Sequence, residues 1–197
     1  MKRGVREFWV PSSLIVMQAA FAFVVVFHGW RSMPAANANP AGDVFRQKVQ
    51  IRKWQYIVIH HSATPSGNAE SFDRFHRYER RWSGGLGYHF VIGNGHGSVD
   101  GQIEIGPRWE AQEDGAHAGI REYNEYGIGI CLVGDFTNGR PTEEQMASLL
   151  ALCRDLMKRC NIGVDHVYGH RELPGATTEC PGREFSMDEL RGLLKQG

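Results

Sequence analysis

Short runs of apolar residues, many of them β-branched or aromatic, recur along the chain between turn-forming residues. Runs of this length and composition predict buried β-strands. The predicted strands are residues 56–59, 88–92, 99–105, 128–133 and 164–168. A stretch rich in Asn and Gly at 94–97 predicts the turn that joins the second strand to the third.

Longer segments between these runs carry apolar residues at helical spacing, and they predict helices over 70–82, 142–160 and 187–194. In the longest of them, Thr142 and Gln145 form the capping-box pattern that begins a helix. Strands interleaved with helices are typical of α/β proteins. We therefore expect a single α/β domain in which a central mixed β-sheet is flanked by helices.

The first residues follow a different pattern. A basic start precedes an almost wholly apolar segment, 9–27, and a stretch rich in Ala, Asn and Pro follows at 31–43. This order is typical of a secretory signal, although the apolar segment is also near the shortest length that spans a membrane. We interpret 1–44 as a signal peptide or an N-terminal membrane anchor with its linker, and 45–197 as the functional domain. Basic residues before the apolar segment predict a periplasmic or extracellular domain, free or anchored to the inner membrane.

Composition narrows the class of protein further. The chain has 197 residues, 42% of them hydrophobic, which is enough for one domain with a core of its own. Its formal net charge is zero, so it lacks the basic surface expected of a nucleic-acid-binding protein. Cys153 and Cys160 are about 10.5 Å apart along a predicted helix, beyond the reach of a disulfide. We expect a monomer with no disulfide framework.

Histidines and a cysteine follow predicted strands at places where loops can bring them together. His60 and His61 end the first strand, His170 follows the last strand, and Cys180 comes shortly after it. Two imidazoles and one thiolate leave the fourth position of a tetrahedral zinc site open, which is typical of catalytic zinc. Spacing alone is a weak indication, because an isolated histidine is more often a hydrogen-bonded structural group.

Several sequence blocks give a stronger indication, and in chain order they are 58–64, 87–92, 115–119, 128–134, 169–172 and 178–182. Together they resemble the zinc-dependent N-acetylmuramoyl-L-alanine amidases (amidase type 2), which include phage lysozyme-type amidases and peptidoglycan recognition proteins. The resemblance extends over about 54–185 and implies the fold of that family. It also implies hydrolysis of the amide bond between N-acetylmuramic acid and L-alanine in peptidoglycan. Zn²⁺ is then the expected cofactor, and the glycan strand and stem peptide are the expected partner.

The resemblance implies that His60, His170 and Cys180 bind the zinc ion. His61 is the alternative to His60 as the first zinc ligand. Successive strand residues point to opposite faces, so only one of the two can face the cleft. The family pattern assigns the ligand to His60. His61 then faces the other side, where it supports the ligands from behind or contacts the substrate.

Catalytic roles also follow from the resemblance. Tyr88 matches the family's active-site tyrosine, whose phenol can bond the attacking water or the developing oxyanion; the alternative is a core aromatic. Thr178 stands where phage-type members carry lysine, and its hydroxyl can donate one hydrogen bond. Cys131 stands where cytoplasmic recycling amidases carry glutamate. These departures leave the general base open between zinc-activated water with Tyr88 and, as a weaker candidate, Glu179.

Other polar residues near these blocks have both a functional and a structural interpretation. His117 lies in a loop rich in Gly and Ala, and it contacts either the substrate or the loop itself. His89 should point away from Tyr88, which favours a structural role. Arg74, Arg77 and Arg81 share one side of a helix and could meet substrate carboxylates, although a solvated basic face is the commoner arrangement.

Two further functions compete with amide hydrolysis of the cell wall. The first is that of a protein that binds or senses peptidoglycan without cutting it. Members of this fold that only bind lack the cysteine ligand. Cys180 is present here, which favours an enzyme. A metalloprotease is the second, but the sequence lacks the His-Glu-x-x-His helix of such enzymes.

Overall fold

The apolar runs of the sequence form one five-stranded sheet in the computed structural model, which describes residues 50–196. Its strands are β1 (Tyr56–His61), β2 (Phe90–Ile92), β3 (Ile103–Ile105), β4 (Gly127–Leu132) and β5 (Val167–Gly169). In the order β3-β2-β4-β1-β5, the last four run parallel and β3 is antiparallel at one edge. The expected α/β fold with a central mixed sheet is therefore confirmed.

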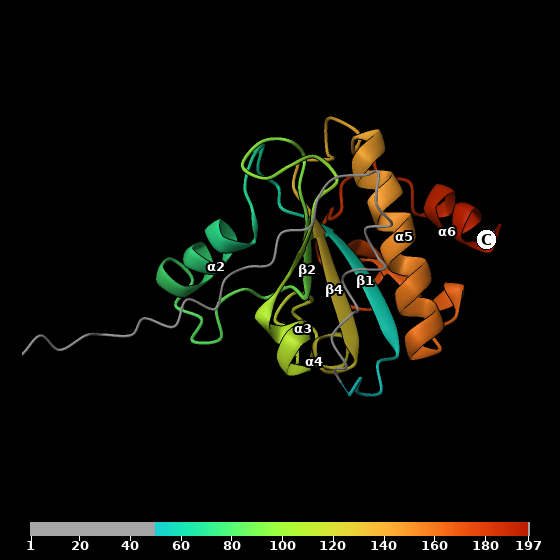
Figure 1. Cartoon of the computed structure of the whole chain (residues 1–197), viewed down its shortest axis with the longest axis horizontal. Helices are drawn as coiled ribbons and strands as arrows, with labels where there is room; N and C mark the ends of the chain where they lie inside the picture. The colour runs from blue at the N-terminus through green and yellow to red at the C-terminus, as the bar shows by residue number, and fades with distance from the viewer. Residues whose placement is uncertain (1–49, 197) are drawn as a thin grey trace, which may run out of the picture.

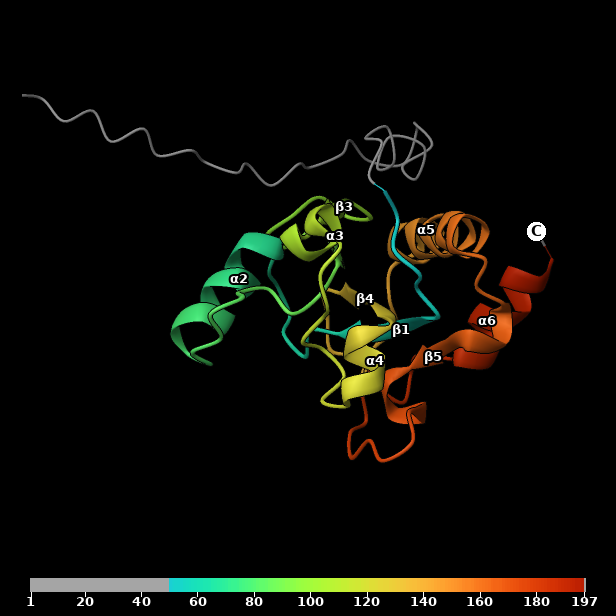
Figure 2. The ribbon, with the colours of Figure 1, turned by 90° about the horizontal axis from the view of Figure 1, so that it is seen from below.

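Helices cover both faces of this sheet (Figure 1). They are α2 (Ala69–Tyr78), α3 (Pro107–Ala111), α4 (Arg121–Glu125), α5 (Glu143–Cys160), α6 (Met187–Lys195) and the 3-10 turns η1 (Val164–His166) and η2 (His170–Glu172). Figure 2 shows α5 and α4 on opposite faces of the sheet, while α2 extends away from it at one side. The capping box at Thr142 and Gln145 forms as predicted and begins α5.

Alternation along β1 divides its side chains between these two faces. Ile57 and Ile59 are fully buried in the larger core cluster, together with leucines of α5. Val58 packs on the other face, in a cluster that includes Tyr123 of α4. His60 shares the face of Val58, so the core beneath α5 supports the strand while the opposite face presents its polar residue.

Several elements differ in extent from the prediction. Tyr88 precedes β2, and α2 ends at Tyr78 because the chain turns at Arg81, whose φ is 58°. The third strand is shorter than predicted, since a left-handed Gly101 (φ 70°) precedes it. The predicted strand 164–168 begins as η1 instead and pairs with β1 only over β5.

The segment 1–44, with its apolar stretch 9–27, lies outside the residues that the structure describes. Within 50–196, no helix combines the length and apolar character needed to cross a bilayer. The four cysteines are free thiols, and Cys153 is buried in the core.

Candidate metal centre

Strand pairing brings the first two predicted ligands together. In the parallel pair of β1 and β5, Ile59 lies opposite Gly169, so the next residues, His60 and His170, emerge side by side. Their ring centroids are 4.6 Å apart. The loop after η2 returns to the same place, because the Arg171 N–H donates to the carbonyl of Cys180 at 2.7 Å.

His60, His170 and Cys180 each offer one ligand atom, and these atoms all lie within 4.8 Å of one another. The Cys180 Sγ is 3.6 Å from Nδ1 of His60 and accepts a hydrogen bond from the His61 N–H at 3.4 Å. Two imidazole nitrogens and a sulfur, with no carboxylate among them, form a donor set that suits zinc rather than a hard cation. The residues present therefore fit a zinc ion with one position left open.

Hydrogen bonds on the far side of each ring fix which nitrogen faces the centre. Nε2 of His170 lies 3.1 Å from the carbonyl of Ala118, which can only accept. This nitrogen must therefore carry the hydrogen, and Nδ1 keeps its lone pair. Such an outer partner is a regular feature of histidines that bind metals.

His60 is oriented by a second imidazole. Its Nε2 is 3.0 Å from Nδ1 of His117, whose Nε2 is in turn 3.2 Å from the carbonyl of Gly127. Because that carbonyl can only accept, His117 carries its hydrogen on Nε2 and accepts at Nδ1 from His60. His60 thus holds its hydrogen on Nε2 and directs the lone pair of Nδ1 toward Cys180.

Burial keeps these groups in their neutral forms. It lowers the pKa of His60 well below the ordinary value, with further lowering by His117 and His170, and it lowers the pKa of His170 as well. Burial also raises the pKa of the Cys180 thiol to about 12. A bound cation would offset that effect by stabilising the thiolate, so metal binding at this site releases a proton.

Tyr88 lies beside the ligands, with its ring centroid 5.3 Å from that of His60. Burial raises the pKa of its phenol well above the ordinary value, and the nearby Cys131 thiol raises it further. Cys131 pairs with His60 in the register of β4 and β1 and is fully buried. Tyr88 is thus a neutral hydrogen-bond donor at the edge of the site.

Thr178 and His61 occupy less direct positions. Thr178 is half-buried, and its Oγ1 accepts from the Cys180 N–H at 3.1 Å, which shapes the loop and leaves its hydroxyl hydrogen free to donate. His61 points to the opposite face of β1, as alternation requires, and its Nδ1 accepts from the Phe136 N–H at 3.1 Å. Its backbone, rather than its imidazole, is the part that touches the ligand set.

His117 was predicted to contact either the substrate or its own loop, and the structure places it behind His60. It is 8% exposed, and both of its ring nitrogens are bonded within the protein. The Asn124 side chain fixes it by accepting from the His117 N–H at 2.8 Å. Gly129 makes room for the ring, since a Cβ there would lie 2.4 Å from its Cδ2. A glycine inside a strand is the sequence signal that such a close approach leaves.

His89 has the structural role that its sequence position favours. It is fully buried, its Nδ1 accepts from the Gly129 N–H at 2.9 Å, and its Nε2 lies 3.1 Å from the carbonyl of Glu113. It therefore links β4 to the loop before α4 without touching a metal ligand.

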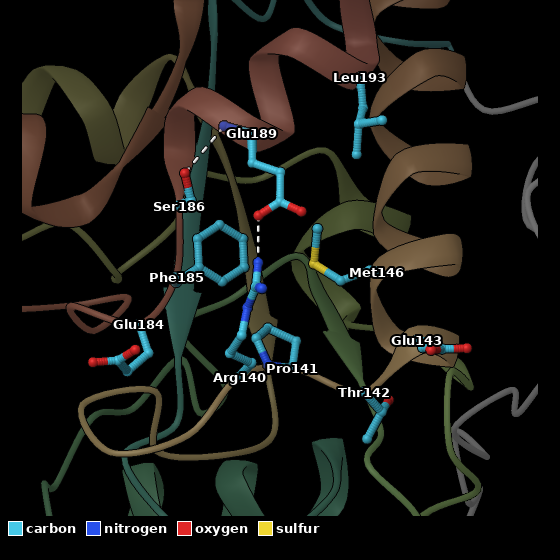
Figure 3. A pocket seen from close by; sticks show the side chains of 10 residues that line it. All are labelled: Arg140, Pro141, Thr142, Glu143, Met146, Glu184, Phe185, Ser186, Glu189 and Leu193. Atoms are coloured by element: carbon cyan, nitrogen blue, oxygen red, sulfur yellow. Dashed lines mark hydrogen bonds and ion pairs between the residues drawn. The ribbon is translucent and has the colours of Figure 1, made fainter.

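A separate cavity of about 400 Å³ lies where α5 and α6 begin (Figure 3). The Arg140 side chain reaches across it to Glu189, and Glu143 and Glu184 also line it. It includes none of the residues of the metal centre and lacks a cluster of histidine or cysteine ligands. The metal centre is therefore the candidate functional site.

Comparison with known proteins shows which family this chain resembles. A family model described as N-acetylmuramoyl-L-alanine amidase matches residues 50–183. The chain is 31% identical over 146 residues to peptidoglycan-recognition protein SC1a of Drosophila melanogaster, covering 70% of this chain and 72% of that protein. It is 30% identical over 143 residues to the N-acetylmuramoyl-L-alanine amidase of Mus musculus, covering 64% of this chain but only 24% of the mouse protein.

Solved structures that are similar to this chain also include an N-acetylmuramoyl-L-alanine amidase. The N-acetylmuramoyl-L-alanine amidase LysC from Clostridium intestinale URNW superposes with a TM-score of 0.63 and 30% identity, over 86% of this chain and 95% of that chain. The sequence match and the shared fold thus point to one family. The chain belongs to the N-acetylmuramoyl-L-alanine amidase family.

Proposed function

We propose that this protein is a zinc-dependent hydrolase that cuts the amide bond between N-acetylmuramic acid and L-alanine in peptidoglycan. The observation that carries the proposal is the grouping of His60, His170 and Cys180, whose ligand atoms lie within 4.8 Å of one another. Membership of the amidase family and the names of its relatives support the same reaction.

Zinc bound by these residues would supply the Lewis acidity that polarises an amide carbonyl and activates a water molecule. The protein's part is to hold the ligands in one orientation. The carbonyl of Ala118 does so for His170, and His117, backed by the carbonyl of Gly127, does so for His60. These outer partners fix the orientation of both rings, which is the usual way in which a protein preorganises histidine ligands.

Tyr88 is the residue best placed to stabilise the developing negative charge. Its raised pKa keeps the phenol protonated at neutral pH, so it can donate a hydrogen bond to the oxygen of the attacked carbonyl. The free hydroxyl hydrogen of Thr178 can support the same charge or hold the leaving amine. Glu179 is exposed beside the Cys180 ligand and stays the weaker candidate for the general base, after zinc-activated water with Tyr88.

Purified full-length protein loaded with zinc should release peptides with free L-alanine amino termini from peptidoglycan, while leaving the glycan strands intact. Mass spectrometry of the soluble products identifies the bond that was cut. Release of reducing sugar ends instead, or no product from folded and zinc-loaded protein, would contradict the proposal.

The Cys180→Ser variant separates an enzyme from a protein that only recognises the polymer. An enzyme should lose turnover and tight zinc binding in this variant while still sedimenting with insoluble peptidoglycan. A pure recognition protein should bind in both forms and cut in neither. Tyr88→Phe is the matched variant that should lose turnover but keep the zinc.

We further propose that the domain works outside the cytoplasm, where peptidoglycan lies, and that 1–44 directs it there as a signal peptide or membrane anchor. The basic start and the apolar segment 9–27 motivate this proposal. Cell fractionation with mass measurement of the mature chain tests it. Intact full-length protein confined to the cytoplasm would contradict it.

A further inference from the structure

Large exposed aromatic side chains are concentrated at one place on the described surface. Phe75 is 47% exposed, Tyr78 is 73% exposed and Trp82 is 38% exposed, and they belong to α2 and the turn after it. Of the residues of α2, only Ala69 is buried. Figures 1 and 2 both show this helix extending away from the sheet. We call these three residues the α2 aromatic surface.

The α2 aromatic surface is continuous. Phe75 and Tyr78 stand three residues apart, so they are neighbours on one side of the helix. The ring of Phe75 is 6.0 Å from that of His76, and His76 stacks on Trp82 with centroids 4.7 Å apart and planes at 27°. Clustered exposed aromatics, unlike single exposed ones, mark places where another molecule binds.

This surface is also joined to the metal centre. The ring of His76 is 5.8 Å from Tyr88, and Tyr88 is 5.3 Å from the His60 ligand. The His76 Nδ1 accepts from the Gly87 N–H at 3.2 Å, which ties α2 to the loop that carries Tyr88. Trp82 covers the same loop, since a Cβ on Gly87 would lie 3.1 Å from its Cζ3. A row of rings therefore runs from the ligand to the exposed end of α2.

Charges around the α2 aromatic surface suit a neutral or weakly acidic partner. Arg80 lies over the ring of Phe75 at 5.7 Å, and Arg74 and Arg77 pair with acidic residues one turn earlier on the helix. Segment 69–82 carries four arginines against Glu70, Asp73 and Glu79, so its formal net charge is only +1. A strongly basic face, which an anionic bilayer would require, is not formed.

We infer that Phe75, Tyr78 and Trp82 bind sugar units of the glycan strand that flank the unit being cut. The inference rests on the proposed function, because the polymer lying at the metal centre is also the one nearest to this surface. Sugar rings carry apolar C–H faces that pack on aromatic rings, and exposed aromatics with a polar edge favour such partly wet contacts. The surface would favour long strands over isolated fragments.

Sedimentation with insoluble peptidoglycan tests the binding step without any catalysis. The Cys180→Ser protein, which should not cut, is compared with the same protein carrying Phe75→Ala, Tyr78→Ala and Trp82→Ala together. We expect binding to weaken about tenfold or more, from the loss of several aromatic contacts. Val99→Ala is the matched control, since Val99 is 54% exposed and belongs to no aromatic cluster. Unchanged far-ultraviolet circular dichroism and thermal midpoint establish that the triple variant is folded.

Two further measurements decide what the surface recognises. Glycan strands stripped of stem peptides should compete for the wild-type surface, and failure to compete would overturn the assignment to sugar. Vesicles of anionic phospholipid should bind wild type and triple variant equally; binding that disappears in the triple variant, with peptidoglycan binding unchanged, would assign the surface to a membrane and overturn the inference.

Kinetics separate this inference from the proposed function. If the wild-type protein cuts peptidoglycan, the triple variant should lose at least about tenfold more kcat/KM on polymer than on a single disaccharide-peptide unit. Equal losses on both substrates would overturn the inference while leaving the proposed function intact. If the wild-type protein cuts nothing, the proposed function fails, and sedimentation of the triple variant still decides whether the surface binds the polymer.

Discussion

The imidazole of His117 offers a sharp test of how the metal centre is organised, through the variant His117→Phe. Phenylalanine keeps a planar ring of similar size in the space that Gly129 leaves open, but it has no nitrogen. The Nε2–H of His60 would then lose its acceptor at 3.0 Å, inside a site where His60 is 1% exposed. Water cannot easily replace that acceptor, so His60 would rotate or exchange its hydrogen between nitrogens.

The size of the effect follows from this one hydrogen bond. Leaving a buried donor without a partner costs about 1–3 kcal/mol. If that cost falls on the metal-bound state, it corresponds to about 5- to 150-fold in the zinc dissociation constant. Loss of an outer partner of a metal-binding histidine commonly costs about 10- to 100-fold, which lies in the same range.

Competition with a chromophoric chelator measures the zinc affinity directly, and the absorption bands of a cobalt-substituted protein report the ligand geometry. His166→Phe is the matched control, since His166 is exposed and its imidazole bonds the Gln55 carbonyl rather than a metal ligand. His117→Asn should recover part of the affinity, because its amide oxygen can accept near the position of Nδ1. A folded His117→Phe protein that binds zinc as tightly as the control would show that His117 does not orient the His60 ligand.

Further outcomes follow from other contacts in the site. Tyr88→Phe should lower kcat by about 100- to 1,000-fold without weakening zinc binding, and a variant as active as wild type in steady-state assays would remove Tyr88 from the mechanism. Gly129→Ala should destabilise the fold by about 1–3 kcal/mol, because its Cβ would lie 2.4 Å from the ring of His117; denaturant titration checks this, and an unchanged midpoint would count against it. Burial lowers the pKa of His89 from 6.5 to about 4, so the unfolded chain takes up a proton there before the folded one does. The metal-free domain should therefore lose about 2 kcal/mol of stability between pH 7 and pH 5 from this group, and urea midpoints that stay level over this interval would contradict the assignment.

The sheet could be predicted from the sequence because its strands are short apolar runs with clear ends. The family resemblance, which the comparisons confirm, supplied the ligand set, and alternation explains why only one of His60 and His61 can face the centre. The pairing of Ile59 with Gly169 then places His60 beside His170. This register is a tertiary feature, so it cannot be predicted from the alternation of residues along a single strand.

The role of His117 was harder to predict from the sequence, for a physical reason. It lies in a loop without periodicity, and its position depends on Asn124, on the space at Gly129 and on the carbonyl of Gly127. The helices α3 and α4 are only five residues long, too short for a helical pattern to emerge from the sequence. Tyr88 lies just before β2 rather than in it, so strand alternation did not govern where its ring points.

X-ray absorption at the zinc edge of the purified protein identifies and counts the atoms around the ion, so it examines the proposed ligand set without relying on activity. We expect one zinc per chain, with one sulfur at about 2.3 Å, two histidine nitrogens at about 2.0 Å and one further light atom from solvent. Cys180→Ser should remove the sulfur contribution. A wild-type spectrum with two or more sulfurs, with a closed shell of protein ligands, or with no bound zinc at all would contradict an open zinc site formed by His60, His170 and Cys180.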